Sequence, residues 1–323
     1  MFVRQQLPEP RVALVRAARP ARLVIRRRLR AVAHPRVCPG RFANASSSSR
    51  WLWWKEAWRA WEKEPYRGTG AGTFEITHRV LRTNNIVVTE PHNVPLQFLS
   101  ETGAIGFFLA LCAIAAATVG VLRRVAGLRG EERAAAVALA VLAAAYVLHS
   151  LVDFDWDFVA VTGPFVLTLG ALLGGRAVRD EPRLSLSPVP VVAAIAIMLS
   201  LLTPWFAQRS TDAARAAIAD GRPLRAFREA RDARSLNPLA LDPVLAQAAA
   251  LEQLGDFQAA REAYIDGVEL QPLNWQPWYY LGLFEVGQQD WGRALPALTR
   301  SVQLDPLNPY PAGALASAKS LAP

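Results

Sequence analysis

A histidine and an asparagine stand side by side at the entrance to a long apolar part of the chain. The segment from His92 to Gly106 reads His-Asn-Val-Pro-Leu-Gln-Phe-Leu-Ser-Glu-Thr-Gly-Ala-Ile-Gly, so polar groups run directly into a hydrophobic span. Histidine is the side chain best suited to exchange protons near neutral pH. At a membrane surface, His92 is therefore a candidate for acting on a substrate that is itself partly lipid. The alternative is a helix entrance with a solvated histidine.

Four apolar segments are long enough to cross a bilayer. They lie near residues 104–122, 134–152, 157–174 and 188–206, each close to the roughly 20 residues that a spanning helix needs. The whole chain is 52% hydrophobic and only 20% charged, which is too apolar for an ordinary soluble protein and too polar for one buried entirely in lipid. We therefore predict four transmembrane helices joined to water-exposed parts.

The charges between these segments predict their orientation. Two links are rich in arginine and should be cytoplasmic by the positive-inside rule: Arg123, Arg124, Arg129 and Arg133 in the first, and Arg176, Arg179 and Arg183 in the other. The turn Asp153-Phe-Asp-Trp-Asp157 lacks Lys and Arg, as expected of an outward-facing turn. His92 and the C-terminal region would then lie outside the cytoplasm.

The first 49 residues form a basic arm. Residues 1–50 hold twelve arginines and one acid, about +11, whereas the whole chain has a net charge of +9. The arm has no signal-peptide core and no spanning segment. Such an arm should stay in the cytoplasm, which conflicts with an extracytoplasmic His92. We interpret residues 1–49 as disordered, or as the product of a truncated or misread amino terminus, with a tail that binds anionic lipid as the alternative.

A tryptophan-rich helix and a glycine-rich turn lead up to His92. Indoles recur at helical spacing: Trp51, Trp54, Trp58 and Trp61. Pro65 ends this helix, whose indole face suits either the headgroup layer or packing against the transmembrane helices. The following segment, Gly68-Thr-Gly-Ala-Gly72, lacks the spacing of a dinucleotide-binding loop and predicts a tight, close-packed turn.

Three motifs share an order and spacing that point to one family: Arg50-Trp-Leu-Trp-Trp, Pro65-Tyr-Arg-Gly-Thr-Gly-Ala-Gly-Thr-Phe74 and His92-Asn-x-x-Leu-x-x-Leu-x-Glu-x-Gly-x-x-Gly106. Together they resemble the O-antigen ligase and polymerase-related family of bacterial envelope enzymes. The resemblance covers roughly residues 50–175 and includes the Asp153-Phe-Asp-Trp turn. Members of that family are polytopic membrane proteins whose large extracytoplasmic loop carries a functional arginine and histidine.

The resemblance implies transfer of a glycan from an undecaprenyl-pyrophosphate carrier to an envelope acceptor, or glycan chain extension, without a nucleotide-sugar donor or a cofactor. His92 would take the proton of the attacking hydroxyl, and Arg50 would stabilise the departing pyrophosphate. Further candidates for substrate binding lie in the same loop: Arg67, Arg79, Arg82, Asn93 and Glu101. Glu101 would orient His92 or cap the helix that begins near it, and Asn93 would fix the loop; the sequence leaves these roles open. His78 is expected at the plain surface.

The chain also departs from that family. Members carry a long run of helices before the loop, and residues 1–49 supply none. We therefore expect weak activity or none, because a transition state needs rigid support. A competing interpretation is a metal-dependent transferase that uses Asp153, Asp155 and Asp157. Because no further ligand cluster is apparent in the sequence, we predict no metal site.

Beyond residue 206 the sequence repeats with a period of 34 residues. The repeated motifs are Leu236-Asn-Pro-Leu239, Leu270-Gln-Pro-Leu273 and Leu304-Asp-Pro-Leu307, together with Ala226, Ala260 and Ala294. The period resembles that of tetratricopeptide repeats, in which small residues let paired helices approach and a proline closes each unit. Gly221 and Gly255 mark turns within the first two units, and Gln289-Asp-Trp stands there in the third.

We therefore predict an all-α protein with polytopic membrane helices followed by a tetratricopeptide-like solenoid. Its parts are the basic arm 1–49, an extracytoplasmic loop 50–103, four transmembrane helices in 104–206 and repeats in 207–323. The expected location is the cytoplasmic (inner) membrane, with lipid and an undecaprenyl-pyrophosphate-linked glycan as partners. The alternative is a non-catalytic membrane-anchored adaptor whose repeats, 207–308, bind an envelope protein. No nucleic-acid role is expected, since no aromatic platform accompanies the basic charge.

Overall fold

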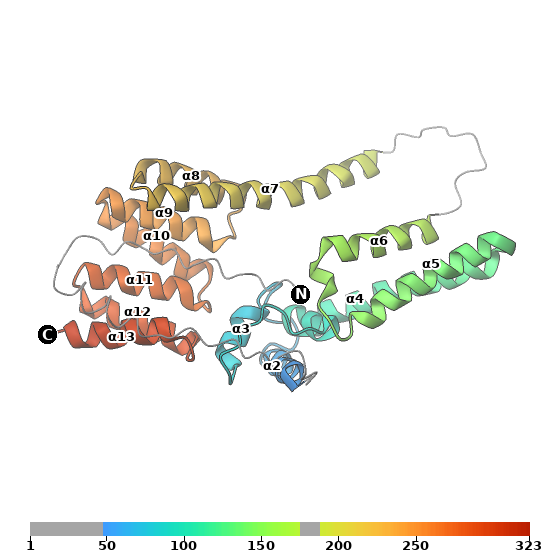
Figure 1. Cartoon of the computed structure of the whole chain (residues 1–323), viewed down its shortest axis with the longest axis horizontal. Helices are drawn as coiled ribbons and strands as arrows, with labels where there is room; N and C mark the ends of the chain where they lie inside the picture. Colours follow the sequence, from blue (N-terminus) through green and yellow to red (C-terminus); the bar gives the residue numbers. More distant parts are fainter. Residues whose placement is uncertain (1–47, 175–187) are drawn as a thin grey trace, which may run out of the picture. The chain divides into compact units, whose positions relative to one another are not determined.

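The computed structural model describes residues 48–174 and 188–323, and within those ranges the regular elements are all helices (Figure 1). The prediction of an all-α protein is thus confirmed. The chain divides into two compact units, one that contains α2 to α6 and one that contains α7 to α13. Apart from Ser48 and Ser49, the predicted basic arm lies outside the described residues.

The first unit combines two helices of the predicted loop region with the apolar helices that follow. Its elements are α2 (Ser48–Lys63), α3 (Phe74–Leu81), α4 (Val94–Gly127), α5 (Gly130–His149), the short 3-10 helix η2 (Asp155–Asp157) and α6 (Val159–Leu173). Helix α2 is the predicted tryptophan helix, and it ends before Pro65 as expected. It packs on α4 and α3 through a side that buries Ala57 and Ala60, while Trp51 and Trp58 stay exposed.

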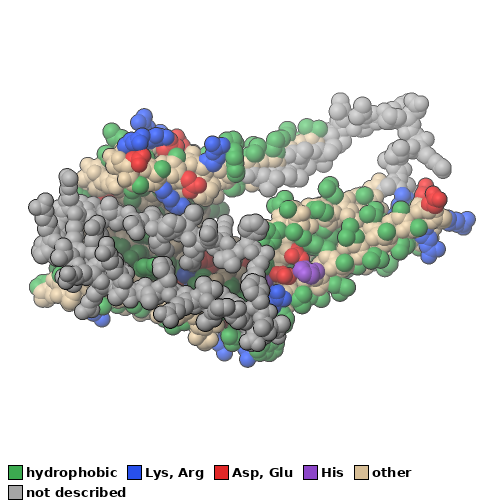
Figure 2. All heavy atoms as spheres, viewed as in Figure 1, with side chains coloured by type: hydrophobic (Ala, Val, Ile, Leu, Met, Phe, Trp, Pro, Cys, Tyr) green, Lys and Arg blue, Asp and Glu red, His purple; other side chains and the backbone are tan. Residues whose placement is uncertain are grey.

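Two helices among the described residues, α4 and α5, are long and apolar enough to cross a membrane. Their exposed apolar side chains form the green surface at the right of Figure 2, as expected for helices surrounded by lipid. Helix α6 has 15 residues, which span about 22 Å, less than the roughly 30 Å of a hydrocarbon core. The fourth predicted segment lies at the start of α7. The arrangement of four transmembrane helices stays a prediction.

The predicted glycine-rich turn packs against a break in α4. At Gly103 the backbone of α4 leaves helical geometry, with φ 67° and ψ −172°. Backbone groups freed by this break pair with the turn: Thr69 N–H donates to Ser100 O at 3.0 Å, and Ala104 N–H donates to Pro65 O at 2.8 Å. Pairing of this kind satisfies groups that would otherwise be left without partners at a helix end. The prediction of a tight, close-packed turn is confirmed.

The second unit is a succession of packed helices. It consists of α7 (Pro188–Ala219), α8 (Pro223–Leu236), α9 (Leu241–Leu254), α10 (Phe257–Leu270), α11 (Trp275–Gly287), α12 (Trp291–Leu304) and α13 (Pro309–Leu321). Each helix contacts the next in the chain, and α7 also contacts α9. Helix α7 runs without interruption across residue 206, so the last predicted membrane segment and the first repeat share one helix.

The 34-residue period has a structural counterpart at several positions. Ala226, Ala260 and Ala294 are all fully buried, which lets neighbouring helices approach closely. The turns within the helix pairs adopt positive φ at Gly221 (69°), Gly255 (82°) and, in the third pair, Gln289 (59°). Gln289 therefore takes a conformation that favours glycine in the other two pairs. The assignment of these pairs to the tetratricopeptide class stays a prediction.

Candidate functional site

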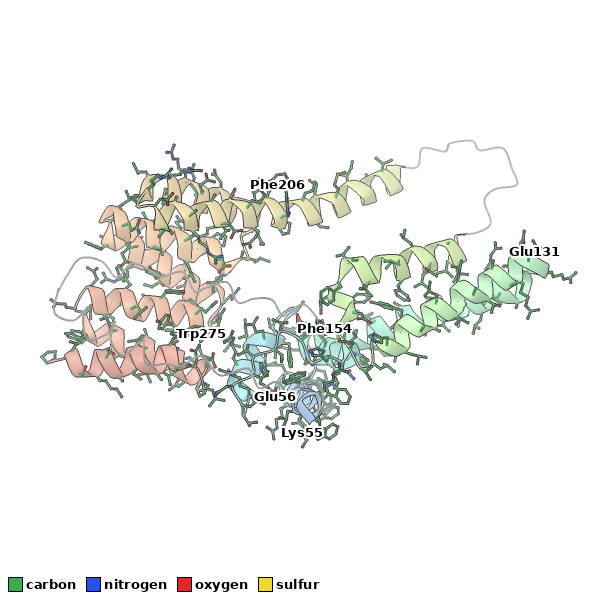
Figure 3. The ribbon with its side chains drawn as sticks, viewed as in Figure 1. Lys55, Glu56, Glu131, Phe154, Phe206 and Trp275 are labelled. Carbon is green, nitrogen blue, oxygen red and sulfur yellow. The ribbon has the colours of Figure 1, made fainter. Side chains whose placement is uncertain are left out.

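His92 lies on the segment between α3 and α4, in contact with two other parts of the first unit. Its imidazole stacks on Trp53 of α2, with ring centroids 5.0 Å apart, and meets the edge of Phe154 at 4.2 Å. Phe154 belongs to the turn after α5, the predicted outward-facing turn (Figure 3). The ring is therefore held between two aromatic side chains and is only partly exposed, unlike a solvated histidine at a helix entrance.

Asp153 orients the His92 ring. His92 Nδ1 lies 3.1 Å from Asp153 Oδ1, and the backbone N–H of Phe154 donates to the same oxygen at 2.9 Å. Because a carboxylate accepts hydrogen bonds, Nδ1 is assigned the proton and Nε2 keeps a free lone pair. This tautomer leaves Nε2 able to accept a proton from a substrate.

Burial, hydrogen bonds and nearby charges together favour the neutral imidazole of His92 and the ionised carboxyl of Asp153. Burial lowers the pKa of His92 below its usual value, although the bond and charge of Asp153 oppose the shift. Burial alone would raise the pKa of Asp153, but the Phe154 N–H, His92 and the Arg50 charge outweigh it and lower that pKa. A neutral imidazole beside an anionic carboxylate is the arrangement that general-base catalysis requires.

Arg50 lies beside the same carboxylate. Its Nη2 is 3.8 Å from Asp153 Oδ2, and its Nη1 donates to Val152 O at 2.6 Å. Arg50 also lines a cavity of about 350 Å³ with Trp51, Trp54 and Val152. The guanidinium has five N–H donors, so those left over from these two contacts can bind phosphate oxygens in the cavity.

Asn93 connects the start of α4 to the turn that carries Asp153. Its Oδ1 accepts the N–H of Leu96 at 2.8 Å and so caps α4, while its Nδ2 donates to Leu151 O at 2.7 Å. The N–H of Val94 also donates to Ser150 O at 2.9 Å. These contacts bring the segment of His92 next to the turn of Asp153, and the role of Asn93 in fixing the loop stays a prediction.

Glu101 has a different role from either of those expected. Its carboxylate accepts the N–H of Gly72 at 3.0 Å and that of Phe74 at 3.1 Å, so it caps the start of α3. Among the described residues the hydrogen-bond partner of His92 is Asp153, so the idea that Glu101 orients His92 is wrong. Nor does Glu101 cap α4, to which it belongs.

The other predicted arginines differ in their surroundings. Arg79 Nη2 lies 2.8 Å from Glu75 on the same helix, an i,i+4 pair on α3. Arg82 is buried, and its Nη1 donates to Asn84 O at 3.5 Å. Arg67 is exposed on the turn before Gly68. Arg50, by contrast, lies beside the Asp153 carboxylate that bonds His92.

His78 is not at the surface, and that expectation is wrong. Its ring is 1% exposed, with Nδ1 2.7 Å from Glu56 Oε2 of α2 and Nε2 3.1 Å from Ile86 O. The ring therefore connects α3, α2 and the segment after α3. This is a structural role, because buried polar groups need such partners.

Glu90 is a further candidate for proton transfer that the sequence alone did not identify. Burial, with smaller contributions from the charges of Asp157, Glu101 and Glu75, raises the pKa of Glu90 to about 7, against the opposing hydrogen bond of Thr89. Its Oε2 is buried without a hydrogen-bond partner. A carboxyl that titrates near neutrality two residues from His92 is suited to proton transfer. The only signal in the sequence was an acid close to His92.

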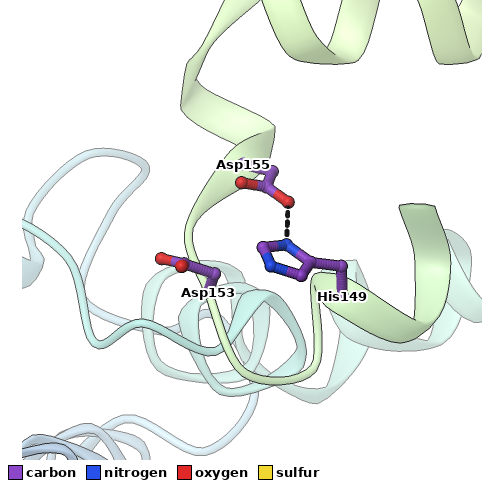
Figure 4. Close-up of side chains that lie close together, drawn as sticks. All are labelled: His149, Asp153 and Asp155. Atoms are coloured by element: carbon purple, nitrogen blue, oxygen red, sulfur yellow. Dashed lines mark hydrogen bonds and ion pairs between the residues drawn. The ribbon is translucent and has the colours of Figure 1, made fainter. Parts of the chain in front are cut away.

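A small cluster at the end of α5 and in the turn that follows it could hold a metal cation. His149, Asp153 and Asp155 each offer a ligand atom, and these atoms lie within 4.8 Å of one another (Figure 4). His149 supplies the additional ligand that the sequence did not reveal beside the alternating aspartates. However, His149 already bonds Asp155, and Asp153 already bonds His92, so a cation would have to displace these contacts.

The fold and the site together indicate a class: an integral membrane protein with a polar histidine–aspartate site next to its apolar helices. A family model described as O-Antigen ligase matches residues 12–111, which include α2, α3, His92 and the first half of α4. The match supports a relationship to the O-antigen ligase family over these residues. None of the curated proteins compared with the chain matches it.

Proposed function

We propose that this chain transfers a glycan from an undecaprenyl-pyrophosphate carrier to an acceptor of the cell envelope, in the manner of an O-antigen ligase. The observation that supports this most directly is the carboxylate of Asp153, which orients His92 with one oxygen and faces Arg50 with the other. The proposed base, His92, and the proposed phosphate-binding group, Arg50, thus contact the same carboxylate. The proposal places the protein in the cytoplasmic membrane, with loop 50–103 and repeats 207–323 outside the cytoplasm.

In this reaction the acceptor hydroxyl attacks the anomeric carbon of the glycan. His92 Nε2 takes the hydroxyl proton as the new C–O bond forms, and the bond between the sugar and the pyrophosphate breaks. Arg50 stabilises the negative charge on the departing pyrophosphate. A positioned base contributes roughly 100- to 10,000-fold to such a rate, and one lost charge-stabilising donor costs about 3 kcal/mol.

The experiment is glycan transfer in cells that express His92→Ala or, as a matched control, His149→Ala. We expect His92→Ala to reduce transfer at least about 100-fold at an unchanged level in the membrane. His149 is an exposed histidine nearby that does not contact His92, so its loss should leave most activity. If His149→Ala abolishes transfer and His92→Ala does not, the metal-dependent interpretation replaces this one.

The second candidate is the non-catalytic adaptor. The family match does not favour it, because the match covers the His92 segment and stops before the repeats. The adaptor predicts that deletion of 207–323 reproduces the whole phenotype of a null strain, whereas His92→Ala has none.

A further inference from the structure

A row of exposed apolar residues follows the 34-residue period of the second unit. Leu239, Leu273 and Leu307 occupy the same position in successive repeats, and their exposed fractions are 75%, 57% and 40%. The residue one period earlier, on α7, is Trp205, which is 51% exposed. Each of the four directly follows a proline. Single exposed leucines are common, but a row set by a structural repeat needs an explanation.

The three leucines share one edge of the unit. Leu239 lies in the link before α9, Leu273 in the link before α11 and Leu307 in the link before α13. The turns at Gly221, Gly255 and Gln289 lie at the opposite ends of the paired helices, because each helix separates a link from a turn. The apolar row therefore belongs to the edge at which α9, α11 and α13 begin.

Helix α7 extends beyond this edge (Figure 1), and the extending part has an apolar sequence. Residues 188–208 contain no charged side chain, and Arg209 is the first charge on α7. Large apolar side chains of this segment are exposed: Val191, Val192, Ile195, Met198, Leu199 and Leu202. The nineteen residues 188–206 rise about 28 Å, close to the roughly 30 Å thickness of a hydrocarbon core.

At the end of the apolar part of α7, residues 205–209 include the side-chain types found where a helix leaves a bilayer. Trp205 and Phe206 are exposed side by side, and Figure 3 shows Phe206 on α7. The guanidinium of Arg209 lies 4.9 Å from the Trp205 ring centroid. Aromatic rings and the long side chains of arginine concentrate at the headgroup layer because each has an apolar body and a polar end. Trp205 is also in register with the three leucines.

We propose that this edge of the second unit rests on the lipid bilayer. Leu239, Leu273 and Leu307 insert into the boundary between headgroups and acyl chains, at the level where Trp205 marks the exit of α7. We propose lipid, and not a protein partner, as the cover of these leucines because their row continues the apolar surface of α7. The proposal concerns the orientation of the repeats and does not depend on catalysis by His92.

The test uses the full chain with Cys38→Ser and Cys112→Ser, reconstituted into vesicles of phosphatidylcholine and phosphatidylglycerol. A fluorophore is attached to Leu239→Cys, Leu273→Cys or Leu307→Cys, and to Gln258→Cys as the matched control. Gln258 is exposed near the turn at Gly255, on the opposite edge. Quenching is then measured with nitroxide lipids labelled near the headgroup, and with aqueous iodide. Circular dichroism shows that each labelled variant is folded.

We expect nitroxide lipids to quench the three edge positions at least about twofold more than position 258, and iodide to show the reverse order. Equal, weak quenching by lipid at all four positions would overturn the proposal. Protection of the edge from iodide without quenching by lipid would also overturn it, because a protein partner or a second copy would then cover the leucines.

Discussion

At the scale of single residues, the proposed chemistry depends on how the Asp153 carboxylate is shared. One oxygen accepts hydrogen bonds from His92 and from the Phe154 N–H, and the other faces Arg50. The carboxylate therefore selects the imidazole tautomer and also holds the guanidinium beside the cavity. Loss of Asp153 should therefore disturb both the tautomer of His92 and the position of Arg50, although both side chains remain.

Asp153→Asn tests this positioning role. We expect kcat/KM to fall roughly 100-fold and the acidic limb of its pH profile to move to lower pH. The base acts when neutral, and the anionic carboxylate stabilises the protonated ring, so its removal lowers the pKa of His92 further. The measurement is the pH dependence of glycan transfer in proteoliposomes. A limb that stays in place or moves upward would mean that Asp153 does not act through His92.

Glu90 should make the stability of the protein depend on pH. Its pKa rises from 4.5 to about 7 in the folded protein, which therefore binds more protons than the unfolded chain between these values. Stability is full below pH 4.5 and falls as the pH rises through 7. Glu90→Gln should raise Tm by about 2–4 °C at pH 8 and change it little at pH 5. The exposed Glu64→Gln serves as the control, and an equal gain at both pH values would contradict the prediction.

At the scale of elements, the joint between the glycine-rich turn and α4 holds the site together. A Cβ on Gly103 would lie 2.4 Å from Tyr66 O, and one on Gly68 would lie 2.4 Å from Glu101 O. Both glycines also have φ 67°. The backbone of the turn can therefore approach the broken helix only where both positions lack a side chain.

Gly103→Ala should destabilise the first unit by at least about 2 kcal/mol, because the added methyl meets backbone atoms and the positive φ is strained. Gly127→Ala, at the end of the same helix, should be nearly neutral because an added Cβ there meets no atom within 4 Å. Thermal unfolding in detergent compares the two variants. Similar Tm values for both would show that the joint tolerates a side chain.

An ion pair between a partly exposed arginine of α10 and a buried glutamate of α11 links these two helices of the second unit. Arg261 Nε and Nη2 lie 2.7 and 2.8 Å from the two carboxylate oxygens of Glu285, which is 1% exposed. Arg261→Met leaves that carboxylate buried without its partner and should cost about 3 kcal/mol. The double variant with Glu285→Met should recover most of this loss. Urea unfolding measures both, and equal stability of Arg261→Met and the unchanged chain would show that the pair contributes nothing.

At the scale of the whole molecule, the distribution of charge predicts how the chain crosses the membrane. The link between α4 and α5 lies within an arginine-rich stretch, whereas the turn after α5 carries aspartates and no Lys or Arg. Helix α5 has 20 residues, enough to place these ends on opposite sides of a bilayer of about 30 Å. Glu131 marks its arginine-rich end in Figure 3.

Thiol labelling tests this orientation in a chain with Cys38→Ser and Cys112→Ser. We expect a membrane-impermeant maleimide to label Leu151→Cys in intact spheroplasts, and Glu131→Cys only after permeabilisation, because positive loops stay in the cytoplasm. Both residues are exposed, so accessibility to water should not separate them. The reverse pattern would place the His92 site in the cytoplasm and contradict the proposed reaction.

The sequence could predict the features that local pattern encodes. Helical spacing predicted α2 and its end before Pro65, and glycine spacing predicted the turn that packs against α4. The 34-residue period located positions such as Ala260 that are buried. These features depend on residues close in the chain, where periodicity and side-chain type act directly on the backbone.

The residue types also identified His92 and Arg50 as candidates, but the sequence alone could not reveal their common partner. His92 and Asp153 are 61 positions apart. They meet because α5 returns the chain to the start of α4, where the N–H of Val94 donates to Ser150 O. Likewise, only the packing of α3 on α2 and α4 buried His78 and directed Glu101 to the amides of α3. Composition and period thus determined the helices and the kinds of chemistry available, whereas tertiary structure decided the pairs, because a hydrogen bond depends on where distant segments meet.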